Sequence, residues 1–169
     1  MEAVIFLRDV IDDGLDTMES FGGPPRTQPV RCFLLCIAMQ ESGPQLEARY
    51  QNSPSTTPGP ARGWYQFEQG GGVTGVLNHA SSRALAIKSC SFLNVLAEPA
   101  AVWRALEGHD VLATIFARLL IYTDPAPIPT TEDAAWDYYL RTWRPGKPHR
   151  AAWATNWQFA TDCVTENPL

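Results

Sequence analysis

Glu41 occupies a position where an apolar side chain is expected. It follows Ala38 by three residues and Ile37 by four, so it falls on the apolar stripe of a helix that we expect over Pro29–Glu41. The last turn is the negative end of the helix dipole, and apolar neighbours also disfavour a charged carboxylate, so both effects should raise the pKa of Glu41. A carboxylic acid that is still protonated near neutral pH can protonate the leaving oxygen of a glycoside. A solvated glutamate at a frayed helix end is the alternative interpretation.

Two short motifs accompany this glutamate. The first is Met39-Gln40-Glu41-Ser42-Gly43, and the second is Gly63-Trp64-Tyr65-Gln66-Phe67, which begins 22 residues after Glu41. The first resembles the Glu-Ser signature of lytic transglycosylases, and the second resembles the Gly-x-x-Gln segment that follows it in that family. The resemblance covers about a quarter of the chain, from Val30 to Phe67.

The sequence departs from the family pattern in two places. Tyr65 stands where the family usually has Met before the Gln. The Tyr-Asn-Ala-Gly turn near the C-terminus of the family is not present as such, although Tyr139, Trp143 and Pro145-Gly146 place an aromatic helix and a glycine turn in a similar position. The far side of the sugar cleft is therefore the part that the resemblance defines least.

The resemblance implies a reaction and a set of roles. The bond would be the β-1,4 linkage between N-acetylmuramic acid and N-acetylglucosamine in peptidoglycan, and Glu41 would be its general acid. Ser42 would position the sugar or the neighbouring chain, and Gln66 would hydrogen-bond an N-acetyl group or the catalytic carboxyl. Tyr139 would contribute from the helix expected over Thr131–Trp143. Trp64 and Tyr65 are further substrate-binding candidates, but with Phe67 they cannot all face the sugar, and core packing is the alternative for each.

A second carboxylate would separate the two possible outcomes of cleavage. Retaining and inverting glycosidases normally use two carboxylates, whereas transglycosylases of this kind use one. Glu47, Glu68 and Asp124 are the candidates, and Glu68 is the best placed because it follows the Gln66 motif directly. A glutamate on the surface is the alternative for Glu68. The sequence therefore leaves hydrolysis by a muramidase and formation of a 1,6-anhydro sugar both open.

The elements that must position these residues are mostly helices. Apolar residues at helical spacing predict helices over the following ranges: Ala3–Ser20, Pro29–Glu41, Val76–Leu85, Phe92–Leu96, Ala100–Leu106, Val111–Tyr122, Thr131–Trp143 and Arg150 to about Cys163. Thr131 and its neighbours are expected to cap the start of their helix. The stretch Tyr50–Gly63 is rich in Pro, Ser and Thr and predicts a loop, and Gly63–Gly75 is too rich in glycine for a long element.

These elements predict one fold class. We expect a mostly α protein of the α+β lysozyme-like type, in which residues 1–169 form a single catalytic domain with a small irregular or β segment beside the cleft. The chain has 169 residues, of which 45% are hydrophobic and 18% are charged, which is typical of one globular domain.

Composition also limits the partners. The net charge of -5 disfavours a nucleic-acid partner, and no run of residues is apolar enough for a membrane span. The acidic start of the chain lacks a recognisable signal peptide, so we expect synthesis in the cytoplasm and action on the wall after release or as a virion component. The size and the absence of a leader resemble phage-encoded members of the family. We assume a monomer, with the glycan strand as its partner.

Other sites are disfavoured by the spacing of their residues. His79, His109 and His149 are thirty or more residues apart, so we expect no metal and no other cofactor. Cys32 and Cys36 lie four apart on the expected helix, a spacing too wide for a disulfide between them, and we expect all four cysteines to be buried thiols. The basic cluster Arg141, Arg144, Lys147, His149 and Arg150 would meet peptide-stem carboxylates or a nucleic-acid backbone, or form a solvated turn.

A second class of function stays open beside the enzyme. A non-catalytic phage structural or glycan-binding protein can keep a lysozyme-like fold, because a fold does not determine a function.

Overall fold

The computed structural model describes residues 1–47 and 59–169. Within them the chain is mostly helical, with one small antiparallel pair of strands. The elements, in chain order, are α1 (Ala3–Phe6), the π-helix η1 (Leu7–Asp12), α2 (Asp13–Ser20), α3 (Gln28–Ser42), β1 (Ala61–Arg62), β2 (Phe67–Glu68), the π-helix η2 (Gln69–Val73), α4 (Thr74–Asn78), α5 (Arg83–Phe92), α6 (Pro99–Ala105), α7 (Asp110–Tyr122), α8 (Glu132–Trp143) and α9 (Arg150–Glu166).

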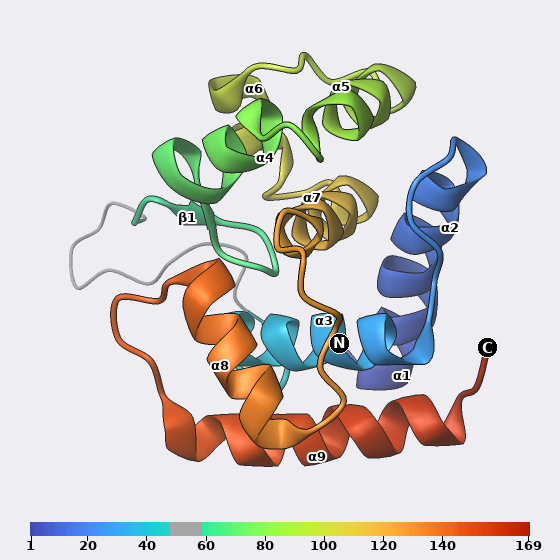
Figure 1. The fold of residues 1–169 in the computed structure, drawn as a ribbon, viewed down its shortest axis with the longest axis vertical. Coiled ribbons are helices and arrows are strands. Elements are labelled where there is room, and N and C mark those ends of the chain that lie inside the picture. Colours follow the sequence, from blue (N-terminus) through green and yellow to red (C-terminus); the bar gives the residue numbers. More distant parts are fainter. Residues whose placement is uncertain (48–58) are drawn as a thin grey trace.

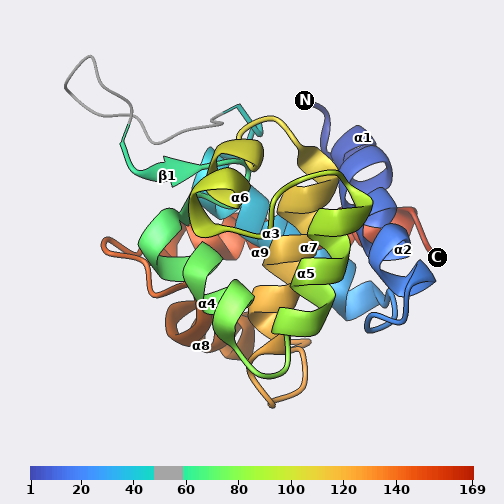
Figure 2. The ribbon, with the colours of Figure 1, turned by 90° about the horizontal axis from the view of Figure 1, so that it is seen from above.

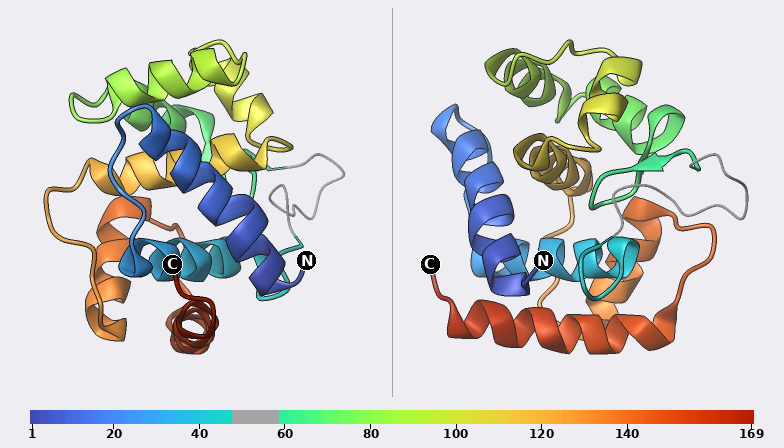
Figure 3. Two further views of the ribbon diagram at one scale, coloured as in Figure 1. Left: turned by 90° about the vertical axis from the view of Figure 1, so that its right-hand side faces the viewer. Right: turned by 180° about the vertical axis from the view of Figure 1, so that it is seen from behind.

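The helices form two layers around α7 (Figure 1). The lower layer in that view contains α3, α8 and α9, and the upper layer contains α4, α5 and α6. The arm α1–η1–α2 runs along one side from the lower layer toward the upper one, as the side and rear views show (Figure 3). Seen from above, α7 passes beneath the upper layer, and β1 lies at the edge away from α2 (Figure 2).

One contiguous apolar core joins these layers. Helices α3 and α7 form its centre, because residues around their whole circumference are buried; Phe33 and Phe116, for example, are fully covered. A helix that is apolar all round must be enclosed by other elements, and here α9 covers α3 while α2 and α5 cover α7. The end of α3 is therefore held rigidly by packing.

A buried ion pair connects α3 with the N-terminal arm. The Arg31 guanidinium donates to both carboxylate oxygens of Asp12, at 2.7 and 2.8 Å, and it also donates to the side chain of Gln28 and the carbonyl of Asn167. This two-pronged geometry fixes η1 and the C-terminal segment against the same turn of α3.

Most helix predictions are confirmed. The stretch Ala3–Ser20 is helical throughout, with a π-helical turn in its middle, and the helices predicted from residues 29, 100, 111, 131 and 150 begin within one residue of those positions. Thr131 stands at the cap position of α8, but its side chain makes no capping hydrogen bond. All four cysteines are free and buried, as expected. In the part of the chain that the structure describes, no helix has the length and apolar character needed to cross a membrane.

Two helix predictions are wrong. The helix predicted over 76–85 is divided, because α4 ends at Asn78 and a turn follows in which the Ser82 hydroxyl donates to the carbonyl of Val76. The helix predicted over 92–96 is absent: α5 ends at Phe92, Asn94 adopts a left-handed conformation (φ 56°), and the Val95 amide donates back to Cys90 at 2.8 Å. This backward hydrogen bond is typical of a helix terminus. The loop predicted over 50–63 falls mainly outside the described residues.

Candidate active site

A cleft of about 1330 Å³ lies beside the C-terminal end of α3. Its walls come from four parts of the chain: the end of α3, the segment from β1 through α4, the end of α7, and α8 with the loop after it. Among its lining residues are Glu41, Gln66, Glu68, Asp124, Tyr139 and Trp143. The cleft therefore contains four of the seven residues that the sequence nominated, Glu41, Gln66, Glu68 and Tyr139, and one of the alternative carboxylates, Asp124.

Glu41 is a partly buried carboxyl in the last turn of α3. Burial raises its pKa to about 7, and the hydrogen bond from Tyr139 opposes part of this shift. The Tyr139 hydroxyl donates to Oε1 of Glu41 at 2.7 Å, and no cation pairs with Glu41 among the described residues. At neutral pH a large fraction of Glu41 therefore carries a proton and faces the cleft with one oxygen already oriented.

Two tryptophans hold Tyr139 in position. Its ring stacks on Trp153 of α9, with centroids 4.8 Å apart and an angle of 25° between the planes, and it also packs against Trp136, 5.6 Å away. Trp153 is fully buried, so this stack anchors the ring in the core. Burial and the nearby Glu41 charge raise the pKa of Tyr139, so its hydroxyl stays protonated as a donor. Sequence reasoning missed both tryptophans, although Trp136 and Tyr139 stand three apart on one helix face.

The Gly63–Phe67 motif forms the turn between β1 and β2, which pair antiparallel with Ala61 opposite Glu68 and Arg62 opposite Phe67. Gly63 has a positive φ of 72°, and a Cβ there would overlap the carbonyl oxygen of Leu106, so only glycine fits. The indole N–H of Trp143 donates to the carbonyl of Tyr65 at 3.0 Å, which ties the turn to α8. The sequence pointed to Trp143 only as part of a weak C-terminal landmark.

Gln66 lies in the cleft wall with its amide group partly engaged. Its backbone is left-handed (φ 49°), and its side-chain Nε2 donates to the carbonyl of Gly63 at 3.0 Å. No hydrogen bond between Gln66 and Glu41 occurs within the described residues. The side-chain carbonyl of Gln66 is thus the group left to accept a hydrogen bond from a ligand, such as the N–H of an acetamido group.

Three substrate-binding expectations are corrected by burial. Trp64 is 3% exposed and donates its indole N–H to Asp110, and Tyr65 is fully buried with its hydroxyl beside that of Thr114. Ser42 is also buried, and its hydroxyl donates to the carbonyl of Trp64 at 2.5 Å. These side chains cannot touch a substrate in this conformation. Ser42 instead positions the neighbouring chain, which was one of the two roles considered for it.

The alternative carboxylates differ in environment. Asp124 lines the cleft and accepts from Arg141 at 2.7 Å and from the backbone N–H of Ala126 at 2.8 Å. Burial alone would raise the pKa of Asp124, but these two hydrogen bonds outweigh burial and lower it. Glu68 lines the cleft with an exposed side chain that forms no ion pair within the described residues, and Glu47 is exposed and does not line the cleft.

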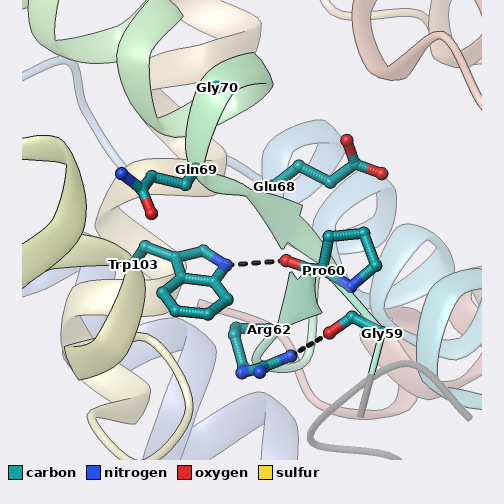
Figure 4. Close-up of a pocket in the computed structure, with 7 residues that line it drawn as sticks. All are labelled: Gly59, Pro60, Arg62, Glu68, Gln69, Gly70 and Trp103. Carbon is teal, nitrogen blue, oxygen red and sulfur yellow. Dashed lines mark hydrogen bonds between the residues drawn. The ribbon is translucent and has the colours of Figure 1, made fainter. Parts of the chain in front are cut away.

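A smaller hollow of about 540 Å³ adjoins the cleft and shares Glu68 and Gly70 with it (Figure 4). Trp103 forms one side of this hollow, where its indole N–H donates to the carbonyl of Pro60 at 2.7 Å. The Arg62 guanidinium lies over the Trp103 ring, 4.4 Å from its centroid, and pairs with Glu107. The two hollows therefore meet at the β2–η2 segment.

In residues 1–47 and 59–169, His, Cys, Asp and Glu side chains do not gather in groups of three or more that could bind a metal ion. The chemistry that the cleft offers is proton transfer at Glu41, together with hydrogen bonding by Tyr139 and Gln66.

Comparison with known proteins adds no relative: no family model, no curated protein and no solved structure matches this chain.

Proposed function

We propose that the chain cleaves the β-1,4 bond between N-acetylmuramic acid and N-acetylglucosamine in peptidoglycan, with a lysozyme-like fold and Glu41 as the general acid. The observation that carries this proposal is a carboxyl with a pKa raised to about 7, lining a large cleft and hydrogen-bonded by a tyrosine that the core holds in place. A group of this kind has the protonation state that glycoside cleavage requires.

The chemical steps follow from the groups in the cleft. Glu41 gives its proton to the glycosidic oxygen as the bond from that oxygen to C1 of the muramic acid breaks. The Glu41 carboxylate that results is stabilised by the Tyr139 hydroxyl, which already donates to Oε1. Glu41 then takes back a proton, either from the C6 hydroxyl of the same sugar, whose oxygen closes on C1, or from a water that attacks C1. The first route gives a 1,6-anhydro sugar, and the second gives a hydrated end.

The environment of Asp124 favours the first route. A second catalytic carboxylate must be free to attack C1 or to activate water, whereas Asp124 is held by Arg141 and by a backbone N–H. Glu68 is the carboxylate that keeps the second route open, because it lines the cleft without an ion pair among the described residues.

Mass spectrometry of digested, purified peptidoglycan tests the proposal. We expect the wild-type chain to release muropeptides, and products lighter by one water would identify the anhydro route. We expect Glu41→Gln to release none while its circular dichroism spectrum is unchanged, because a glutamine has no acidic proton to donate. Glu47→Gln, at an exposed position outside the cleft, is the matched control and should digest as the wild type does.

The outcomes separate the two functional classes. Digestion by Glu41→Gln at the wild-type rate would rule out Glu41 as the acid. Binding of peptidoglycan by the wild-type chain without any product would favour a glycan-binding protein that is not an enzyme.

A further inference from the structure

The loop between α8 and α9 brings positive charge to the cleft of an acidic protein. We call residues 144–149, Arg-Pro-Gly-Lys-Pro-His in sequence, the basic loop. Arg144, Lys147 and His149 all line the same cleft as Glu41. The chain as a whole has 18 acidic and 13 basic residues, so a cleft wall with this composition runs against the net charge of -5. Such a local field raises the concentration of anionic ligands near the site.

The basic loop is connected directly to the helix that carries the acid. Gln40, the neighbour of Glu41, donates from Nε2 to the carbonyl of His149 at 3.2 Å, and its Oε1 accepts from the buried Asn156 of α9 at 2.9 Å. At the other end of the loop Arg144 caps α8 in a left-handed conformation (φ 50°, ψ 52°). Two prolines further limit the conformations of the loop. The backbone of the basic loop is therefore held against the helix that carries Glu41.

Most ionisable groups near the loop are already neutralised. Arg141 pairs with Asp124, and Arg150 pairs with Glu132 and Asp133. Arg144 and Lys147 are exposed and form no ion pair with any residue in the described ranges. Arg144 donates to the carbonyl of Arg141, at 3.3 Å, which directs its guanidinium without neutralising it. Two cations in the cleft are thus available to a ligand.

We propose that the basic loop binds the carboxylates of the peptide substituent on the glycan strand. This inference rests on the proposed function, because it takes the strand in the cleft to be peptidoglycan. The sugar rings and their acetamido groups are neutral, so the anionic groups of such a strand lie on the lactyl-peptide branch of each muramic acid. Carboxylates are matched by the planar fork of Arg144 and by the ammonium of Lys147. The preferred substrate would then be a strand that keeps acidic stems.

Chemical neutralisation of the stems tests this inference. Sacculi would be treated with a carbodiimide and ammonia, which converts carboxylates into neutral amides of nearly the same shape. Co-sedimentation would measure binding to treated and untreated sacculi, and product release would be followed in parallel. For the wild-type chain at low ionic strength we expect about tenfold weaker binding to the treated sacculi, and the difference should shrink as salt is added.

Two double variants with the same change in charge test whether the basic loop causes the difference in binding between treated and untreated sacculi. In the double variant Arg144→Gln/Lys147→Gln, the ratio of binding between untreated and treated sacculi should fall to about one. The control Arg83→Gln/Arg104→Gln removes two exposed cations on α5 and α6, outside the cleft, and should keep the wild-type ratio. Thermal denaturation of each variant would verify that both remain folded.

Each outcome decides the inference separately from the proposed activity. Equal binding of the wild-type chain to both kinds of sacculi would overturn the inference, and so would an unchanged ratio in the loop variant. Weaker binding to treated sacculi without any product would support the basic loop as a carboxylate site and reject the cleavage reaction. Release of product from both kinds of sacculi at equal rates would support the cleavage reaction and reject the basic loop as a carboxylate site.

Discussion

Two carboxylates line the same cleft, and their surroundings push their pKa values in opposite directions. Glu41, at the end of α3, has a tyrosine hydroxyl as its partner, and burial raises its pKa to about 7. Asp124, after α7, is also partly buried, but Arg141 and a backbone N–H hold its pKa below the usual value. At neutral pH Glu41 can donate a proton and Asp124 cannot.

The difference comes from the partners and from the deeper burial of Glu41, and not from the residue type. Both side chains lose hydration, which on its own raises the pKa of a carboxyl. At Glu41, the hydrogen bond from one neutral donor offsets only part of this rise in pKa. At Asp124, a cation and a backbone N–H more than offset it. A pair of carboxylates with separated pKa values is a recurring feature of sites for acid–base chemistry. In this cleft the paired carboxylate serves to fix Arg141 on α8.

Glu41→Gln should have the largest effect of the substitutions considered, and it should act on how the free energy of unfolding depends on pH. The folded pKa of about 7 lies above the ordinary value of 4.5, so between these values the folded chain binds more protons than the unfolded chain. The contribution of Glu41 to the free energy of unfolding should therefore fall as pH rises from 4.5 through 7, by about 3 kcal/mol. Urea unfolding at pH 4.5, 6 and 8 would measure it.

Glu41→Gln should lack this dependence, since a glutamine does not titrate, and Glu47→Gln should keep it. If the free energy of unfolding of the wild-type chain changed between pH 4.5 and 8 in the same way as that of Glu41→Gln, this result would contradict the raised pKa of Glu41.

Tyr139→Phe should have a smaller effect, on the pH dependence and the rate of cleavage. Loss of the hydroxyl removes the one hydrogen bond that lowers the pKa of Glu41, so the acid keeps its proton to higher pH. We expect the alkaline limb of the pH–rate profile to move upward, by less than one pH unit, and the maximal rate to fall about tenfold because the product carboxylate loses its donor.

Tyr122→Phe is the matched control, since the Tyr122 hydroxyl makes no hydrogen bond in the described part of the chain. A rate loss in Tyr139→Phe with an unmoved alkaline limb would show that Tyr139 supports the structure and leaves the proton affinity of Glu41 alone.

Asp124→Asn should have the smallest effect. The pair with Arg141 lies near the surface, and such pairs contribute about 1 kcal/mol or less to stability. Because we assign Asp124 no chemical step, the rate of glycan cleavage should stay within about twofold of the wild-type rate, which turnover of peptidoglycan would measure. A loss of about 100-fold or more, the range for a general acid or base, would instead make Asp124 the second catalytic carboxylate.

Prediction from sequence succeeded where periodicity and spacing carry the information. The apolar stripe of α3 placed Glu41 at a helix end among apolar neighbours, and the structure confirms the helix and the direction of the pKa shift. Most of α5 was not predicted, because it lies between the two helices expected over 76–85 and 92–96. The second of these fails because Asn94, and not glycine, adopts the left-handed conformation just after α5.

The composition of the cleft could not be predicted in the same way. Whether Trp64 and Tyr65 face a ligand or the core depends on contacts with Asp110 and Thr114, more than 40 residues away in sequence. The stack of Tyr139 on Trp153 likewise joins two helices whose relative position no local pattern specifies. Local rules identify a side chain that can do chemistry, whereas the partners that tune it come from tertiary packing.

Gly63 illustrates how a residue can be indispensable without taking part in any reaction. Its missing side chain lets the β1–β2 turn rest against the backbone at the end of α6, and that distance sets where Gln66 and Glu68 stand along the cleft. In a saturation mutagenesis screen for lytic activity, we expect Gly63 to tolerate substitution as poorly as Glu41 does. Expression level separates the two positions. Every Gly63 substitution should lower the yield of folded protein, whereas Glu41→Gln should accumulate normally and lose only the cleavage of the glycan.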